Sequence, residues 1–355
     1  MAHYPHFKIE GNPYERGIAY GRRTAELIEI SIWNYSKMFE AFSDLTWSDA
    51  RKRSLDFLPS IEAYTPDLLD EMKGIAEGSG LTFEDILTLN SRSEIVLDTS
   101  VDGCTAFGVT PEFSSEGKTY ICQNWDWIRR QKDTLVVIEI AQEPSPSILM
   151  IAEAGIISGK GLNSSGLGVC FNALSTGQGK PGIPVHVLLR RILDSKTLGD
   201  AVESVASAER ASSGNFLIGT SEGEIINIES APEDFGVLYA EKGYLAHTNH
   251  FLCINHVCNV KDHGKVILPD TFHRLGRIKG LLENKKGSVD FNTCHEFLSD
   301  HRNFPDSICR HEDQKDPQGK QLASVYSAIM DLKERQLWLT STNPCSGDFE
   351  SYTFL

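Results

Sequence analysis

The apolar residues of this 355-residue chain change their spacing close to residue 104, and that change limits the folds available to it. Before this point they recur with the period of amphipathic helices. After it they form short β-branched or aromatic runs separated by turn residues, which is typical of antiparallel strands. We therefore expect helices first and then many strands with helix pairs inserted. This order favours an α+β fold in which helices sandwich two sheets.

Four helices are predicted in the first hundred residues. The first runs from Asn12 to about Phe42, and Glu15, three residues after the capping asparagine, completes the pattern of a capping box. The other three are predicted at 46–57, 66–80 and 82–97. Each opens with Thr or Pro, which are common at helix starts.

The strands and remaining helices are predicted from the second part of the chain. Single strands are expected at 105–110, 119–125, 134–142 and 147–155. Hairpins are expected at 159–174, 215–230 and 323–342, and helices at 184–194, 198–209, 271–284 and 290–299. No repeat, low-complexity tract or linker interrupts this pattern. We therefore expect one domain over residues 1–355.

Charge and hydropathy exclude several classes of partner. The chain has 34 Lys and Arg against 49 Asp and Glu, a formal net charge of −15, which argues against binding to nucleic acid or to an anionic membrane. No apolar run approaches the roughly 18 residues of a membrane span, and no secretory signal is visible. We expect a cytoplasmic protein, in which the eight cysteines are thiols.

The segment 101–110, VDGCTAFGVT, places a cysteine at a turn. Asp-Gly favours a bend, so Cys104 is expected at the edge of an element, either as a nucleophile or as a small apolar residue that begins a strand. If the chain were cut before Cys104, a thiol and an α-amine with a pKa of about 7.7–8 would share one residue. The amine could accept the thiol proton. Gly103 would leave the thiol room to reach the preceding carbonyl.

A second segment, 247–263, is rich in residues that can bind a metal ion. It contains His247, His250, Cys253, His256, Cys258 and His263. The spacing is irregular and yields no set of four zinc ligands, so we expect a strand end followed by a polar loop and no metal. The chain also lacks a phosphate-binding loop and a G-x-S-x-G nucleophile motif.

Five ordered motifs carry a resemblance to a known family. They are DGCT (102–105), QNWDW (123–127), EAGIISGKGLNSSGLGVCFNAL (153–174), HTNH (247–250) and FPDSICR (304–310). Together they resemble the fungal acyl-coenzyme A:isopenicillin N acyltransferase family over nearly the whole chain. The resemblance implies an N-terminal nucleophile hydrolase fold, which is an αββα sandwich. It also implies a precursor that cleaves itself between Gly103 and Cys104 into an α subunit, 1–103, and a β subunit, 104–355, that remain together as a heterodimer.

The same resemblance implies the site residues. Cys104 matches the nucleophile, and Asp126, Asn249 and Arg310 match the other catalytic positions. An asparagine amide can donate a hydrogen bond to an oxyanion. Asp126 can orient the α-ammonium group, and Arg310 can hold Asp126 or an anionic group of the substrate. The alternative for these two residues is a structural ion pair. Asp102 and Thr105, which flank the expected cleavage site, are the supporting positions.

The activity that this resemblance implies is acyl transfer from acyl-coenzyme A to a β-lactam amine, such as 6-aminopenicillanic acid, through a Cys104 acyl-enzyme. No cofactor is expected, and the partners are a small-molecule acyl donor and an amine acceptor. One alternative is a cysteine amidase that uses water as the acceptor. Another is a catalytically silent or metal-holding protein on the same scaffold. Ala106, in place of a second threonine, and the C-terminus Ser351–Leu355, without a peroxisomal address, indicate a non-peroxisomal relative.

Overall fold

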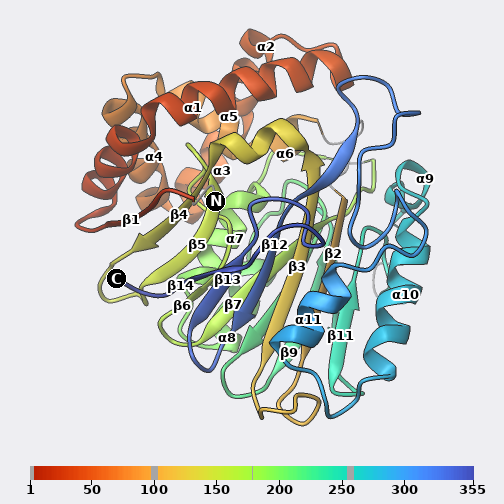
Figure 1. The fold of residues 1–355 in the computed structure, drawn as a ribbon. Helices are drawn as coiled ribbons and strands as arrows, with labels where there is room; N and C mark the ends of the chain where they lie inside the picture. The colour runs from red at the N-terminus through yellow and green to blue at the C-terminus, as the bar shows by residue number, and fades with distance from the viewer. Residues whose placement is uncertain (1–3, 97–102, 178, 254–259) are drawn as a thin grey trace.

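Two β-sheets form the centre of the computed structural model, which describes residues 4–96, 103–177, 179–253 and 260–355 (Figure 1). The larger sheet contains, in spatial order, β1 (His6–Ile9), β4 (Leu135–Ile140), β5 (Ile148–Glu153), β6 (Lys160–Asn163), β7 (Leu167–Ala173), β8 (Gly214–Thr220), β9 (Ile225–Ser230) and β10 (Phe235–Tyr239). The smaller sheet contains β11 (Tyr244–His247), β2 (Gly103–Val109), β3 (Tyr120–Ile128), β12 (Leu322–Asp331), β13 (Gln336–Leu339) and β14 (Glu350–Tyr352). Apart from the parallel pair of β1 and β4, these neighbouring strands are antiparallel.

The helices fall into three groups along the chain. The N-terminal group contains α1 (Pro13–Ser43), α2 (Trp47–Ser54), the 3-10 helix η1 (Leu55–Phe57), α3 (Leu58–Tyr64), α4 (Pro66–Ser79), α5 (Phe83–Asn90) and α6 (Arg92–Ile95). The 3-10 helix η2 (Arg129–Thr134) and the pair α7 (Val185–Leu193) and α8 (Leu198–Ala206) interrupt the strands. The last group contains α9 (Gly264–Ile267), α10 (Thr271–Glu283) and α11 (Phe291–Leu298).

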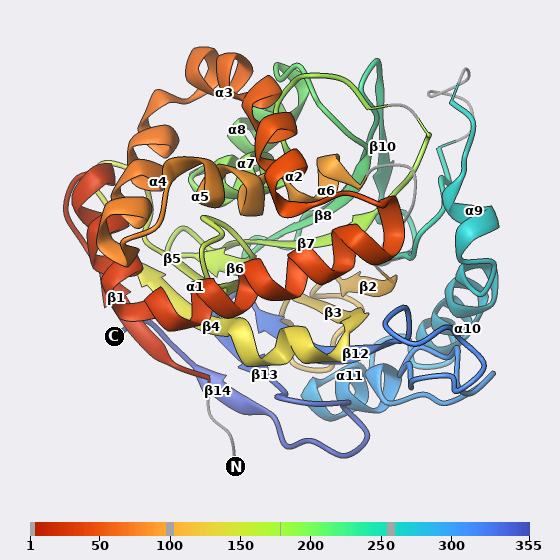
Figure 2. The same cartoon turned by 90° about the horizontal axis from the view of Figure 1, so that it is seen from above.

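These elements form four layers. The inner faces of the two sheets pack through β2 and β3 against β7 and β8. Helices α7 and α8 cover the outer face of the larger sheet, whereas α10 and α11 cover the smaller one. Figures 1 and 2 show the N-terminal helices gathered over one end of this sandwich, away from α10 and α11. The predicted α+β class and αββα arrangement are confirmed.

Local capping explains the starts of the N-terminal helices. The Asn12 side chain accepts a hydrogen bond from the Glu15 backbone, and the Glu15 carboxylate accepts one from the Asn12 backbone, as the sequence predicted. Thr82 and Asp85 form a second capping box at the start of α5. These reciprocal bonds satisfy N–H groups that have no partner inside a helix.

Glycines allow helices α1 and α4 to approach closely. A Cβ at Gly17 would lie 2.1 Å from the carbonyl oxygen of Glu71, and one at Gly74 would lie 2.2 Å from that of Tyr14. Real Cβ atoms cannot make contacts this short, so this crossing requires glycine at both positions. The contact holds the N-terminal helices together as one packed group.

Three sequence predictions need correction. The first hundred residues are not all helical, because His6–Ile9 forms β1 and pairs with β4, more than a hundred residues away. The helix predicted at 82–97 divides into α5 and α6 at Ser91, whose φ of −114° and ψ of 13° leave the helical region. Short elements such as α3, α9 and β14 were also missed, because three to seven residues are too few for a periodic pattern.

Two apolar cores lie on opposite faces of β2. Cys104 and Ala106 belong to the core between the sheets. Phe107 and Val109 belong to the core between the smaller sheet and helices α10 and α11. Because side chains alternate along a strand, the start of β2 places the cysteine on the inter-sheet side. No helix in the described part of the chain is long and apolar enough to cross a membrane.

Candidate active site

Cys104 lies at the start of β2, where it pairs with Trp125 of β3. The sequence predicted a cysteine at an element edge, and the structure places it there, as the second residue of the strand. The residue is only 1% exposed. The thiol is therefore held in a water-poor space between the sheets, which suits chemistry on an activated acyl group.

The backbone of Cys104 is fixed from both sides. Its N–H donates to Oδ1 of Asn249 at 3.0 Å, and its carbonyl oxygen accepts from Nη1 of Arg274 at 2.5 Å. The same Arg274 nitrogen donates to Oγ1 of Thr105 at 3.2 Å. The nitrogen that would become an α-amine after cleavage is thus already bonded to a buried acceptor.

Asn249 follows β11 in a turn anchored on the first residue of α10. Its backbone N–H donates to Oγ1 of Thr271 at 2.8 Å. Its Oδ1 accepts from Nη2 of Arg274 at 2.9 Å, and its Nδ2 donates to the Ala173 carbonyl at 3.1 Å. Because a guanidinium group can only donate, Arg274 fixes which end of the amide faces Cys104. That end is the carbonyl oxygen, so the predicted oxyanion role would fall to the Nδ2 group.

Gly103 packs against Asp126 and Arg310. A Cβ at position 103 would lie 2.9 Å from Cβ of Asp126 and 3.5 Å from Nε of Arg310. The Arg310 Nε is 3.5 Å from Oδ2 of Asp126, and Ser324 Oγ donates to the other carboxylate oxygen at 2.7 Å. The structure therefore brings together the glycine of the predicted cleavage site and the two residues predicted as an ion pair.

The Asp126 carboxyl has an unusual environment. It is completely buried, and its Oδ2 has no hydrogen-bond partner. Burial raises the pKa of Asp126 to about 6, although the Arg310 and Arg274 guanidinium groups work in the opposite direction. This carboxyl can therefore exchange a proton close to neutral pH.

Asp270 connects the two halves of the site. It accepts a hydrogen bond from Nε of Arg274 at 2.6 Å and another from Nη2 of Arg310. Although burial opposes ionisation, these two arginines hold the pKa of Asp270 below its ordinary value. Arg310 also donates to Asp306 at 2.5 Å. The Asn249 side and the Asp126 side of the site are thus linked through one carboxylate.

Sequence reasoning missed Arg274, Asp270 and Ser324. Asp270 and Arg274 are four residues apart at the start of a helix, which is also the spacing of an ordinary surface ion pair. Only the fold reveals that Arg274 is fully buried under β2. The supporting residue Thr105 is in contact with Arg274, whereas Asp102 lies outside the described residues.

His247 and His250 of the 247–263 segment contact different partners. His247 Nε2 lies 2.6 Å from Oε1 of Glu229, and His250 Nδ1 lies 2.8 Å from Oγ1 of Thr271. Within the described ranges, this segment contains no group of converging ligand atoms. Of its possible ligands, His256 and Cys258 fall outside those ranges.

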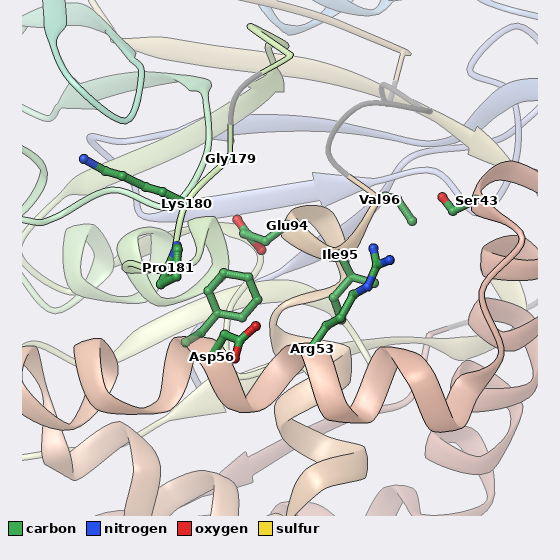
Figure 3. Close-up of a pocket in the computed structure, with 10 residues that line it drawn as sticks. Ser43, Arg53, Asp56, Glu94, Ile95, Val96, Gly179, Lys180 and Pro181 are labelled. Carbon is green, nitrogen blue, oxygen red and sulfur yellow. The ribbon is translucent and has the colours of Figure 1, made fainter.

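A cavity of about 440 Å³ opens near the end of α6 (Figure 3). Its lining residues come from the N-terminal helices and from the loop before α7: Ser43, Arg53, Asp56, Phe57, Glu94, Ile95, Val96, Gly179, Lys180 and Pro181. The Glu94 carboxylate accepts from the Val185 backbone at 2.9 Å and from Ser212 at 2.7 Å. Among the described residues, this lining includes none of the predicted site residues.

Comparison with known proteins gives a family match and several similar chains. The family described as acyl-coenzyme A:6-aminopenicillanic acid acyl-transferase matches residues 113–346. The 40 kDa form of acyl-coenzyme A:6-aminopenicillanic-acid-acyltransferase from Emericella nidulans is 29% identical over 325 residues, covering 90% of this chain and 88% of that one.

Two solved hydrolases are also similar. The C2A mutant of conjugated bile acid hydrolase from Clostridium perfringens has a TM-score of 0.48 and 16% identity, and the match covers 70% of this chain and 97% of that chain. Penicillin V acylase from Agrobacterium tumefaciens has a TM-score of 0.48 and 14% identity, with 71% and 86% covered.

Proposed function

Because the chain belongs to the acyl-coenzyme A:6-aminopenicillanic acid acyltransferase family, we propose that it is a self-processing acyltransferase with Cys104 as its nucleophile. The protein is an enzyme of acyl transfer or amide hydrolysis. The observation that carries the finer proposal is the 3.0 Å hydrogen bond between the Cys104 nitrogen and Asn249 Oδ1. That bond fixes the nitrogen that cleavage would convert into a catalytic base.

The first proposed step is self-cleavage between Gly103 and Cys104. The Cys104 thiol attacks the Gly103 carbonyl carbon, the peptide C–N bond breaks, and the thiol proton passes to the departing nitrogen. This step frees the α-amine of Cys104 and leaves Gly103 bound to the sulfur as a thioester. Water then hydrolyses the thioester, which frees the thiol and leaves Gly103 with a terminal carboxylate. Asp126 supports this step, because its carboxyl packs against Gly103 and has a pKa of about 6. The products are an α subunit and a β subunit held as a heterodimer by the core between the sheets, which contains residues of both.

The second proposed step is acyl transfer. The free α-amine accepts the Cys104 thiol proton, because an α-amine with a pKa of about 7.7–8 is partly neutral at pH 7. The thiolate attacks the thioester carbonyl of an acyl-coenzyme A, and coenzyme A leaves as its thiol. An amine then attacks the acyl-enzyme and releases Cys104. Asn249 Oδ1 keeps the α-amine in place through both half-reactions.

The oxyanion of each tetrahedral intermediate requires a donor, and we assign this role to Asn249 Nδ2. In the uncleaved chain it donates to the Ala173 carbonyl, and a side-chain amide carries a second N–H. One such donor can supply roughly 3–4 kcal/mol of transition-state stabilisation. Arg274 assists indirectly, because it holds Oδ1 and so fixes where the NH₂ group lies.

The relative from Emericella nidulans suggests the substrate class. Its name specifies acyl-coenzyme A and 6-aminopenicillanic acid, so an acyl-coenzyme A thioester and a β-lactam amine are the proposed donor and acceptor for this chain. The sequence prediction of a cytoplasmic enzyme without a cofactor is retained in this proposal. A cysteine amidase with water as acceptor is the second candidate, because the same acyl-enzyme would serve it.

Trapping the acyl-enzyme tests the proposal. Purified protein is mixed with an aryl-acyl-coenzyme A, and intact mass is recorded for wild type and for Cys104→Ala. We expect the mass of one acyl group to be added to fragment 104–355 of wild type and to be absent from the variant. An adduct that persists in Cys104→Ala would contradict the assignment of the nucleophile.

Partitioning between acceptors separates the two candidates. Coenzyme A release, free acid and amide product are measured while the concentration of 6-aminopenicillanic acid is increased. A transferase should form amide at the expense of free acid. If free acid remains the sole product at every amine concentration, water is the acceptor, as the second candidate requires.

A further inference from the structure

Four potential metal ligands converge beside Arg310. They are the side chains of His301, Cys309, His311 and Cys345, whose ligand atoms all lie within 4.8 Å of one another. Nε2 of His301 is 3.1 Å from Nε2 of His311. Sγ of Cys309 and Sγ of Cys345 lie 3.6 and 3.5 Å from the same His311 nitrogen.

These separations match the edges of a tetrahedral zinc site. Zn–N bonds of about 2.0–2.1 Å and Zn–S bonds of about 2.3 Å give, at tetrahedral angles, N···N near 3.3 Å and N···S near 3.6 Å. The observed values are 3.1 Å between the nitrogens and 3.5 to 3.6 Å between nitrogen and sulfur. Three of the six edges of the cluster therefore have the lengths expected for tetrahedral zinc, and the other three are no longer than 4.8 Å.

From this geometry we propose that His301, Cys309, His311 and Cys345 bind a structural zinc ion. Two cysteines and two histidines make a closed set of four ligands, which leaves no position for substrate and is typical of structural rather than catalytic zinc. The cysteine ligands bind as thiolates and release their protons to solvent on binding. His301 and Cys345 are exposed, so the ion can enter from solvent.

The proposed zinc would join two segments without regular structure. Three ligands lie in the long connection 299–321 between α11 and β12, and Cys345 lies in the connection 340–349 between β13 and β14. Long connections of this kind need an additional constraint to keep one conformation. A four-ligand metal site supplies it, since its binding free energy becomes folding free energy of the connected segments.

Neighbouring hydrogen bonds connect the cluster to the candidate active site. Nδ2 of Asn343 lies 3.9 Å from Sγ of Cys309 and also donates to the Arg310 carbonyl at 2.7 Å. Arg310 stands between two of the ligands, and its backbone N–H donates to Ser324 at 3.0 Å. The zinc would therefore act as a positioning element that holds the backbone of Arg310 in register with Asp126. Sequence reasoning missed this cluster, because spacings of 8, 2 and 34 residues separate these ligands.

Metal content of the purified full-length protein tests the proposal. The protein is produced in zinc-supplemented medium, purified under reducing conditions without a metal-affinity tag, dialysed, and analysed for zinc by mass spectrometry. We expect one zinc per wild-type chain and near-complete loss in Cys345→Ser and His301→Ala. Both ligands are on the surface, so these variants should fold. His273→Ala is the matched control, because this histidine bonds the Arg302 carbonyl outside the cluster and should leave the zinc content unchanged.

Cobalt substitution gives a second readout that does not depend on activity. Addition of Co²⁺ to metal-free wild type should produce a thiolate-to-cobalt charge-transfer absorption, which Cys345→Ser should weaken and Cys309→Ser combined with Cys345→Ser should abolish. Chelator should lower the melting temperature of wild type and leave that of His301→Ala unchanged.

Three results would overturn the proposal. They are a wild-type protein that neither carries zinc nor takes up Zn²⁺ or Co²⁺ after reduction, full zinc content in the double variant His301→Ala/Cys345→Ser, and recovery of Cys309 and Cys345 as a disulfide that resists reduction. None of these measurements uses acyl transfer. The zinc proposal can therefore fail while the proposed function holds, and the proposed function can fail while the zinc proposal holds.

Discussion

Two buried ionic networks in this molecule differ in how completely their charges are paired. In the first, Glu71 of α4 accepts from Arg190 of α7 through both carboxylate oxygens, at 2.7 and 3.1 Å, and from Arg16 of α1 at 3.0 Å. In the second, the closest approach of Arg310 to Asp126 is the 3.5 Å contact of Nε with Oδ2, and neither atom makes a hydrogen bond. The first network fastens helices, whereas the second leaves a buried carboxyl incompletely satisfied beside the predicted cleavage site.

The competing carboxylates explain the incomplete pairing. Arg310 donates to Asp270 and Asp306, so its hydrogen bonds are directed away from Asp126. Burial raises the pKa of Asp126 to about 6 against the partial opposition of Arg310, whereas the two arginines that bond Asp270 outweigh burial and lower its pKa. A carboxyl placed in this way is poorly suited to stability and well suited to proton exchange, which is the usual mark of a functional position. The predictions below test this contrast.

The largest expected effect is on stability, at Glu71. Glu71→Gln should lower the free energy of unfolding by about 3–5 kcal/mol at pH 7.5, because it leaves two buried guanidinium groups without their shared anion. Urea unfolding in the Cys104→Ala background measures this without interference from cleavage. Glu26→Gln, an exposed change on α1, should be nearly neutral. A loss below 1 kcal/mol for Glu71→Gln would remove the contrast between the networks.

The next effect is on catalysis. Asn249→Ala should lower kcat for acyl transfer about 10²–10³-fold, equivalent to about 2.7–4 kcal/mol, with a smaller change in KM. The variant should remain folded, as monitored by circular dichroism. Asn284→Ala, an exposed change at the end of α10, should leave kcat unaltered. An unchanged kcat in Asn249→Ala would remove Asn249 from the site.

Neutralising Asp126 should raise the free energy of unfolding, whereas neutralising Glu71 should lower it. The folded pKa of Asp126, about 6, lies above the ordinary value of 3.8, so ionisation of this group destabilises the fold. The penalty is complete above pH 6, at most about 3 kcal/mol, and disappears as the pH falls below 4. Asp126→Asn in the Cys104→Ala background should thus be more stable than its parent at pH 7.5.

The pH dependence of that gain provides its own control. Urea unfolding at pH 7.5 and at pH 4 should show a gain for Asp126→Asn that shrinks at the lower pH. If Asp126→Asn is the less stable protein at pH 7.5, Asp126 belongs with Glu71 as a structural ion-pair partner.

The smallest expected effect is at Gly103. Gly103→Ala would place a methyl group 2.9 Å from Cβ of Asp126, which should cost about 1–3 kcal/mol and slow cleavage. Gly276→Ala is the matched control, because a Cβ there meets no atom within 4 Å. Cleavage is followed by gel densitometry after synthesis. Equal cleavage rates in the two variants would show that the space at residue 103 is unimportant.

Local signals made much of the fold predictable. Asn12 and Thr82 cap their helices through residues three positions later, so a short stretch of sequence contains the whole interaction. The turn at Asn163 likewise identified its hairpin. Strand β1 was missed because its stability depends on β4, a contact that four residues cannot signal.

The candidate site was predictable only in part. The resemblance pointed to Cys104 and Asn249, which the structure places in contact. Arg274, which bonds both residues, lies 170 positions after Cys104, on a helix where it resembles a surface cation. The proposed zinc ligands were missed because Cys345 lies 34 residues after His311, and only the fold brings the two side chains together.

Intact mass of the freshly purified protein tests the central claim most directly. The account predicts that wild type, expressed without added protease, gives two species corresponding to residues 1–103 and 104–355, whereas Cys104→Ala gives one chain of 355 residues without activity. A wild-type protein that transfers acyl groups while uncut, or a Cys104→Ala chain that is still cut before residue 104, would contradict it.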